Sequence, residues 1–166
     1  MRLGANDIYG GVIGTVLASV TLAAIPIGQT PGYSAVWIMV SVAIAALTRS
    51  YGQHVSTHHV GPGSGFWRDL GKHLLTGVPM LIACIPTLVA LLVAHLTGWN
   101  DDVVQSDGSI VAGYTTVVLG MNAALLFAWG VVAGRISGYS TIGSCAVGLG
   151  NTALGVAVIV TNVLIR

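Results

Sequence analysis

Charged side chains are scarce in this sequence. Only 7% of its 166 residues are Asp, Glu, Lys or Arg, and glutamate is absent altogether. A soluble domain carries about 25% charged residues, because its surface must be solvated. Hydrophobic residues make up 54% of the chain, and its mean hydropathy is +0.86. The scarcity of charge therefore excludes an ordinary soluble domain and predicts an integral membrane protein.

Basic residues, cysteines and catalytic motifs are also few. Six Lys and Arg residues give a net charge of +1, which leaves no basic stripe for nucleic acid. The two cysteines, Cys84 and Cys145, lie inside apolar runs, where a small buried hydrophobe is expected rather than a disulfide or metal ligand. The sequence has no G-x-S-x-G, P-loop or H-E-x-x-H motif. We therefore do not expect an enzyme.

Five apolar runs are long enough to cross a bilayer as helices. A hydrocarbon core about 30 Å thick needs roughly 20 apolar residues. The runs, bounded by charged residues, Gly or Pro, cover residues 8–27, 33–54, 74–96, 110–133 and 142–165. The predicted fold class is therefore all-α, a bundle of five transmembrane helices in a single domain that covers residues 1–166.

The basic residues indicate how these spans are oriented. With a cytoplasmic N-terminus, five of the six Lys and Arg residues fall at cytoplasmic ends, as the positive-inside rule requires. These five are Arg2, Arg49, Arg68, Lys72 and Arg135. We expect an N-in, C-out topology. Because the chain is short and has little sequence outside the predicted spans, we expect a multi-pass protein of the bacterial plasma (inner) membrane.

Two of the connections between spans are longer than turns. Residues 56–73 include an aromatic and basic stretch, which suits a cytoplasmic amphipathic segment at the headgroup boundary. There Trp67 would lie in the interface, with Arg68 and Lys72 towards lipid phosphates. A solvated connector is the alternative. The acidic loop over residues 98–109 is expected to be a simple connector.

Small residues recur at four-residue spacing in three of the predicted spans. Such stripes let helices approach closely in lipid. The stripes are Gly10, Gly14 and Ala18, then Gly130, Gly134 and Gly138, then Ser144, Gly148 and Thr152. In addition, the amides of Asn122, Asn151 and Asn162 are expected to hydrogen-bond between helices. We expect a tight bundle with at least one stripe left for a partner subunit, most simply in a homodimer.

Two prolines, Pro79 and Pro86, lie seven residues apart in the third predicted span. A proline inside a helix removes one backbone hydrogen bond and kinks the helix. We therefore expect this span to be bent or partly unwound, which can open a cavity.

Two ionisable residues fall at the same predicted end of the bundle, Asp7 at the start of the first span and Arg49 near the end of the second. Ionisable groups at membrane depth are costly, so each needs a partner. The two can form a neutralised ion pair. Alternatively, Asp7 is a cation ligand or proton acceptor at the mouth of a transport path that also includes Arg49, Gln53 and His54.

The second span ends in a histidine-rich stretch. His54 and His58 are four residues apart on a helix, a spacing that lets two imidazoles hold one metal ion. Asp7 would supply a third ligand, and the cofactor would be a divalent metal ion. A histidine cluster that contacts headgroups or titrates near neutral pH is equally consistent with the sequence.

Three segments resemble the vacuolar iron transporter (VIT) family. Residues 3–7 (Leu-Gly-Ala-Asn-Asp) are similar to the G-A-N-D-G opening of that family, and residues 51–56 resemble its A-G-E-Y-V-S. Residues 125–138, followed by a Gly-rich fifth span, are similar to its closing pair of helices. The resemblance implies a five-span dimer that exchanges divalent iron or manganese for protons beside the first span, with Asp7 in the place of the family's membrane Asp.

Two residues depart from that family's pattern. Arg49 stands where the family usually has a metal-contacting Met, and Gln53 replaces a Glu. A fixed cation about 4 Å from a divalent ion raises the energy of that ion by roughly 8 kcal/mol at an effective dielectric constant of 20. The resemblance therefore implies a shared fold rather than shared iron transport.

Two functions are compatible with these features. The first is a small membrane transporter or channel with a VIT-like fold that moves a cation or proton past the inner ends of spans one and two. The second is a non-transporting accessory subunit whose glycine-rich faces dock onto a larger membrane complex. The polar cluster and the prolines favour the first, whereas the missing acidic ligands favour the second.

Overall fold

Five long helices make up most of the protein. The computed structural model describes residues 4–57 and 66–165. The long helices are α1 (Ala5–Ala24), α2 (Pro31–Thr57), α4 (Val78–Thr97), α5 (Tyr114–Ile136) and α6 (Thr141–Ile165), and the short helix α3 is Phe66–Leu75. Each of the five long helices is long and apolar enough to cross a membrane. The predicted class of a helical, multi-pass membrane protein with five spans is confirmed to that extent.

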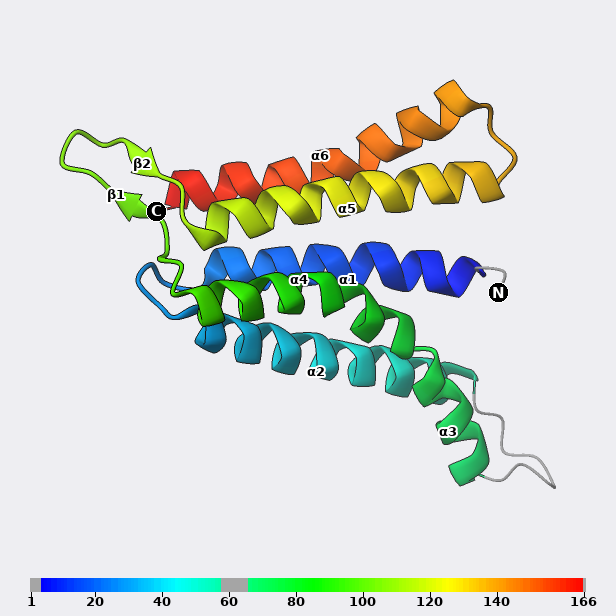
Figure 1. Ribbon diagram of the computed structural model, residues 1–166. Coiled ribbons are helices and arrows are strands. Elements are labelled where there is room, and N and C mark those ends of the chain that lie inside the picture. Colours follow the sequence, from blue (N-terminus) through cyan, green and yellow to red (C-terminus); the bar gives the residue numbers. More distant parts are fainter. Residues whose placement is uncertain (1–3, 58–65, 166) are drawn as a thin grey trace.

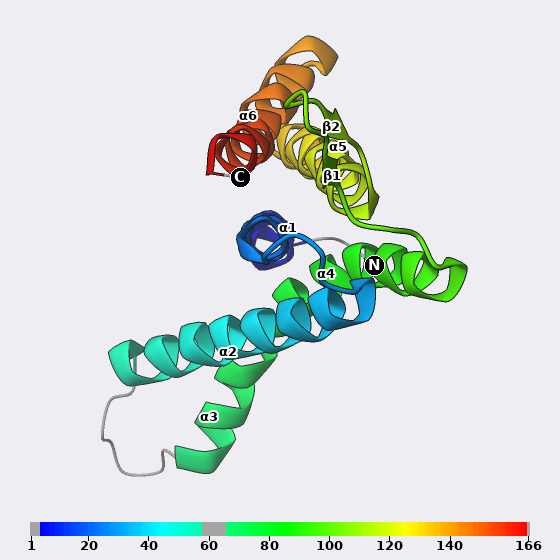
Figure 2. The same ribbon diagram turned by 90° about the vertical axis from the view of Figure 1, so that its left-hand side faces the viewer.

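Helix α1 lies at the centre of the bundle. The pair α5 and α6 lies on one side of it, and α2 and α4 lie on the other (Figure 1, Figure 2). It contacts all four other long helices. One end of the bundle carries α3 and the start of α1, and we call it the α3 end. The opposite end carries a small β-ribbon, and we call it the hairpin end (Figure 1).

Glycines let α1 pack closely against two neighbours. A Cβ atom at Gly14 would lie 2.5 Å from the carbonyl oxygen of Met80 in α4, and one at Gly10 would lie 2.6 Å from a proline of the same helix. Gly11 faces α5, where a Cβ atom would lie 2.5 Å from the ring of Trp129. Because residues four apart share a helix face, one side of α1 is fitted to α4 and the next side to α5.

The other stripes of small residues join α5 to α6. Gly130 packs against the backbone of Gly148, and Gly134 packs against Ser144. Ala18, which completes the α1 stripe, is fully buried. These glycines are therefore used for packing within the chain, whereas Gly138, the last residue of the α5 stripe, has nothing within 4 Å of its Cβ position. A partner subunit on one of the stripes stays a prediction.

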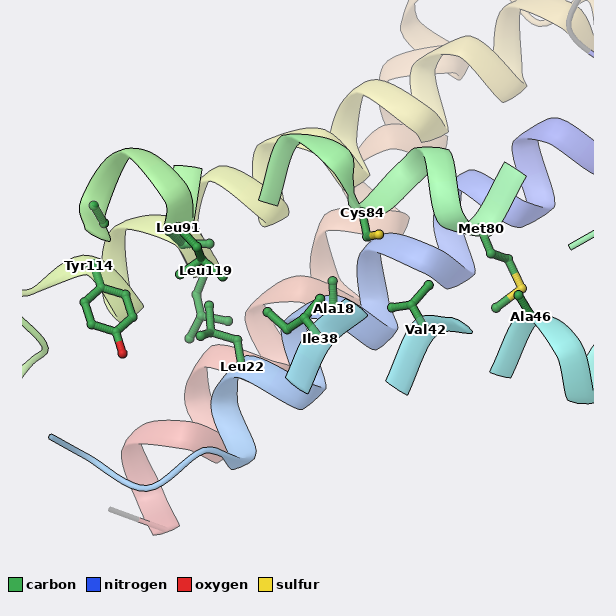
Figure 3. Packing of buried hydrophobic residues seen from close by; sticks show 12 residues of the cluster. Ala18, Leu22, Ile38, Val42, Ala46, Met80, Cys84, Leu91, Tyr114 and Leu119 are labelled. Carbon is green, nitrogen blue, oxygen red and sulfur yellow. The ribbon is translucent and has the colours of Figure 1, made fainter. Parts of the chain in front are cut away.

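An apolar core runs between α1, α2, α4 and α5. Figure 3 shows its members converging from these helices: Ala18, Leu22, Ile38, Val42, Ala46, Met80, Cys84, Leu91, Tyr114 and Leu119. The outward faces are apolar as well, with side chains such as Ile44 and Ile82 more than half exposed. An apolar exterior around an apolar core is what a helix bundle in lipid requires.

Three polar side chains bond to one another within this core. Asn122 of α5 donates through Nδ2 to Ser19 Oγ of α1 (3.0 Å), and its Oδ1 accepts from Thr87 Oγ1 of α4 (2.7 Å). The hydroxyl of Ser19 donates to the carbonyl oxygen of Thr15 (2.8 Å). Bonds of this kind stabilise membrane bundles by about 0.6–2 kcal/mol each. Asn122 thus joins three helices, and Asn162 of α6 likewise donates to a carbonyl of α1 (2.9 Å).

Two of the span boundaries that differ from the prediction have a clear local cause. Residues 110–111, expected in the fourth span, form strand β2 (Ile110–Val111), which pairs antiparallel with β1 (Val103–Val104). An Asp-Gly pair in the connecting turn favours this hairpin over an extension of the helix, so α5 begins only at Tyr114. The first span ends at Ala24 rather than residue 27, because Pro26 holds the residue before it in an extended conformation.

The third span begins with a turn rather than with a kink. Helix α3 ends at Leu75, and α4 begins at Val78. Pro79 therefore lies in the first turn of α4, where its missing N–H group removes no helical bond. Pro86 lies inside the helix. The chain bends at the junction of α3 and α4 (Figure 1), and a kink at Pro86 stays a prediction.

Two aspartates make the loop between α4 and α5 more than a simple connector. Asp102 accepts hydrogen bonds from the N–H (3.2 Å) and hydroxyl (2.8 Å) of Thr116 and thereby caps α5. Asp101 accepts from the hydroxyl of Thr115 (2.6 Å) and from the N–H of Gly28 (3.0 Å) in the turn after α1. The prediction of a simple connector is wrong, because carboxylates satisfy the free N–H groups at a helix start and tie two turns together.

The contact between α1 and α4 predicts opposite effects for two glycine substitutions. Gly14→Ala should lower the free energy of unfolding by about 1–3 kcal/mol, because the new methyl group collides with the α4 backbone. Gly120→Ala is the matched control, since that glycine lies in α5 with open space beside it. It should raise stability by up to about 1 kcal/mol through helix propensity. Unfolding of both variants in mixed micelles measures the difference, and equal effects would contradict the packing described here.

Candidate functional site

Polar side chains gather at the α3 end, where α1, α2 and the turn between α3 and α4 meet. We call this cluster the polar junction. It consists of Asn6, Arg49, Gln53, His54, His73 and Thr76. Three separate segments are brought together because α1 packs on the start of α4 while α3 returns beside the end of α2.

Asn6 connects α1 to the two other segments. Its Oδ1 accepts a hydrogen bond from Arg49 Nη2 (2.8 Å), and its Nδ2 donates to the carbonyl oxygen of Thr76 (3.4 Å). Asn6 lies four residues before Gly10, so it shares the face of α1 that packs on α4. A hydrogen bond to a charged group stabilises a fold by about 1.5–3 kcal/mol. Asn6 is therefore the main anchor of the guanidinium.

Thr76 connects α2 to the turn before α4. Its hydroxyl oxygen lies 2.6 Å from Gln53 Oε1 and 2.6 Å from the carbonyl oxygen of His73. A hydroxyl has a single proton, so it donates to one of these oxygens at a time. With the Gln53 amide turned over, its nitrogen would donate to Thr76 while Thr76 donates to His73, and both contacts would then be bonds.

Arg49 places a fixed positive charge in the junction, because a guanidinium stays protonated in proteins. Its Cζ atom lies 4.3 Å from the centre of the Tyr9 ring, a cation–π contact. Its second terminal nitrogen, Nη1, is buried and has no hydrogen-bond partner among the described residues. The charge is thus held by an amide oxygen and an aromatic face.

Asp7 does not form the ion pair with Arg49 that the sequence suggests. Its Oδ2 accepts a hydrogen bond from the N–H of Gly4 (2.8 Å), so the carboxylate caps its own helix. An acid in the first turn is stabilised by the free N–H groups there. Consecutive residues point about 100° apart around a helix, and it is Asn6 that faces Arg49. The alternative role of Asp7, as a cation ligand or proton acceptor, stays a prediction.

Two imidazoles meet in the junction. The rings of His54 in α2 and His73 in α3 pack edge to face, with centroids 5.4 Å apart and planes inclined by 67°. His54 is only 2% exposed. Its predicted neighbour His58 lies outside the described residues. The histidine that the structure brings to His54 comes from another helix.

The predicted metal site is not assembled in the described part of the chain. Within residues 4–57 and 66–165, no three His, Cys, Asp or Glu side chains are grouped so that they could hold a metal ion. Of the predicted ligands, Asp7 bonds to its own helix start and His54 packs on His73, while His58 is not described.

Three members of the junction are not among the residues predicted from the sequence, namely Asn6, His73 and Thr76. Asn6 could have been predicted from the sequence, because it lies one helical turn before Gly10 and on the same helix face as Gly10 and Gly14. No sequence pattern places His73 and Thr76 in the junction, because only the return of α3 towards α2 brings them to His54 and Gln53.

No protein-family model, no curated protein and no solved structure matches this chain. The resemblance to the VIT family therefore stays a prediction from the three segments that carry it.

The uncharged Asn6 should contribute more to the stability of the fold than the charged Asp7 does. Asn6→Ala should lower the free energy of unfolding by about 1.5–3 kcal/mol, because Arg49 loses its oxygen partner. Asp7→Asn should cost less than about 1 kcal/mol, since an amide oxygen can still accept from Gly4. Unfolding of the two variants in the same mixed micelles compares them. A larger loss for Asp7→Asn would favour the ion pair instead.

Proposed function

We propose that this chain is a small membrane transporter or channel that moves protons past the polar junction, with His54 and His73 as the proton carriers. The supporting observation is the contact between the buried imidazole of His54 and the half-buried imidazole of His73 at one end of an apolar bundle. Ionisable groups at membrane depth are costly and commonly mark ion paths or proton relays. Imidazole is the side chain whose charge normally changes between pH 5 and 8.

The charge of the junction favours a proton over a divalent metal ion. Arg49 is a permanent cation, and no carboxylate is bonded to it in the described chain. A proton brings one unit of charge where a divalent metal brings two, so the repulsion from Arg49 is halved at equal distance. A proton also needs a single nitrogen, whereas a metal ion needs several ligands. Asn6, Gln53 and Thr76 are uncharged groups that can orient water beside the imidazoles.

The proposal includes an orientation in which the α3 end faces the cytoplasm. The Lys and Arg residues of the described chain all lie at this end and none lies at the hairpin end. Of the five aspartates, two lie at the α3 end and three at the hairpin end. The cations are Arg49, Arg68, Lys72 and Arg135. This asymmetry supports an N-in, C-out topology by the positive-inside rule. A homodimer and a bacterial plasma membrane stay predictions.

The weak burial of α6 favours a second candidate, a non-transporting subunit of a larger membrane complex. In its span 17% of residues are buried, against 39% in the spans that contain α1, α4 and α5. A mostly apolar groove of about 660 Å³ lies between α1 and α6 and is lined by residues such as Val20, Ala24, Ala157 and Thr161. A helix of a partner chain would fit there. Purification only together with foreign chains would support this candidate over the transporter.

Proton flux into proteoliposomes tests the transporter. Under an imposed pH gradient and with a potassium shunt, the purified chain should acidify the vesicle interior faster than empty vesicles do. His54→Gln and His73→Gln should each slow this flux at least about tenfold, because a proton carrier is lost. His95→Gln is the matched control, since this histidine is exposed on α4 near the hairpin end.

The control variant should transport protons like the unaltered chain. A flux equal to that of empty vesicles would contradict transport, and so would equal fluxes in all three histidine variants. A flux that persists in His54→Gln and His73→Gln but disappears in Asp7→Asn would move the path away from the imidazoles.

A further inference from the structure

The short helix α3 exposes large apolar side chains. Trp67 is 80% exposed, Leu75 is 68% exposed and Leu74 is 40% exposed. Trp67 and Leu74 are seven residues apart, so they share one face of the helix. On a water-soluble surface such a face would be unfavourable, but a tryptophan beside leucines is typical of the interface between lipid and water.

The same helix exposes two cations. Arg68 and Lys72 are four residues apart and both are exposed, so they form a second face beside the apolar one. A helix with an apolar face and a basic face suits a membrane surface whose lipids are anionic. The two faces of α3 therefore match two layers of one bilayer leaflet, the acyl boundary and the phosphates.

The position of α3 in the fold is compatible with a location at the membrane surface. Its last residue, Leu75, lies three positions before Val78, where the apolar helix α4 begins. Helix α3 does not continue along the axis of α4 but leaves the bundle at an angle beside the end of α2 (Figure 1, Figure 2). It thus lies beside the end of α2 and directly before the start of α4.

Charge also selects the lipid. Helix α3 carries two exposed cations, Arg68 and Lys72, and a single acid, Asp69, whereas Asp101 and its neighbours lie at the opposite end. Each Lys or Arg near an anionic membrane surface strengthens binding to that surface by up to about fivefold. We propose that α3 is a lipid-binding helix that inserts Trp67 and Leu74 into the interface and holds anionic headgroups with Arg68 and Lys72.

Energy transfer from Trp67 to labelled lipids tests the proposal on the full chain. The protein is reconstituted in phosphatidylcholine vesicles that contain traces of dansyl-labelled phosphatidylglycerol or dansyl-labelled phosphatidylcholine. The contribution of Trp67 is the difference between the unaltered chain and Trp67→Phe. We expect at least twofold greater transfer to the anionic lipid, and a ratio near one in the double variant Arg68→Gln, Lys72→Gln.

Arg135→Gln is the matched control, because Arg135 is exposed at the same end but belongs to α5. It should keep the preference for anionic lipid. The proposal is overturned by a ratio near one in the unaltered chain, by an unchanged ratio in the double variant, or by an equal loss in Arg135→Gln. Loss of the preference on adding millimolar inorganic phosphate would point to a soluble anion and would also overturn it. Quenching of Trp67 by aqueous iodide gives a second test, and full access to iodide in vesicles contradicts insertion.

Discussion

The close approach of α1 to α4 is the contact on which the rest of the structure depends. Gly10 and Gly14 leave no side chain between the two helices, so the side of α1 that carries them is fixed against α4. The same side brings Asn6 to the carbonyl of Thr76 at the α3 end. The adjacent side carries Ser19 to Asn122 of α5 in the middle of the bundle. One pair of glycines thus sets the register of both polar clusters.

Scarcity of charge gives the few polar groups distinct roles. Asp102 satisfies a helix start at the hairpin end, and Asp7 does the same for α1 at the α3 end. Both acids are therefore used to cap helices, and Arg49 is left to an amide oxygen and an aromatic ring. In the part of the chain that the structure describes, Arg49 has no bonded acid and lies in the same cluster as two imidazoles. Its positive charge therefore opposes the binding of a metal ion in the polar junction. It opposes a proton less strongly, because a proton brings a single charge and occupies a single nitrogen.

Much of the architecture can be predicted from the sequence, because the length of an apolar run is enough to identify a span. The ends of the spans are less predictable, since they depend on turn chemistry such as the Asp-Gly hairpin before Tyr114. The junction depends on helix faces and on long-range reversal of the chain. Asp7 is predicted in the site because it is charged, yet its neighbour Asn6 is the residue that faces the site. His73 reaches His54 only because α3 folds back beside α2.

Transport through the junction requires that water reach it from one side of the membrane only. Gln53→Cys, placed in a half-buried position beside Thr76, tests this most directly in sealed vesicles with a membrane-impermeant thiol reagent. Gly71→Cys on the exposed surface of α3 serves as the reactive reference. The account predicts that the cysteine at position 53 is labelled from the side that labels the cysteine at position 71, and not from the other. Absence of labelling at position 53 from either side, with position 71 fully reactive, would contradict it.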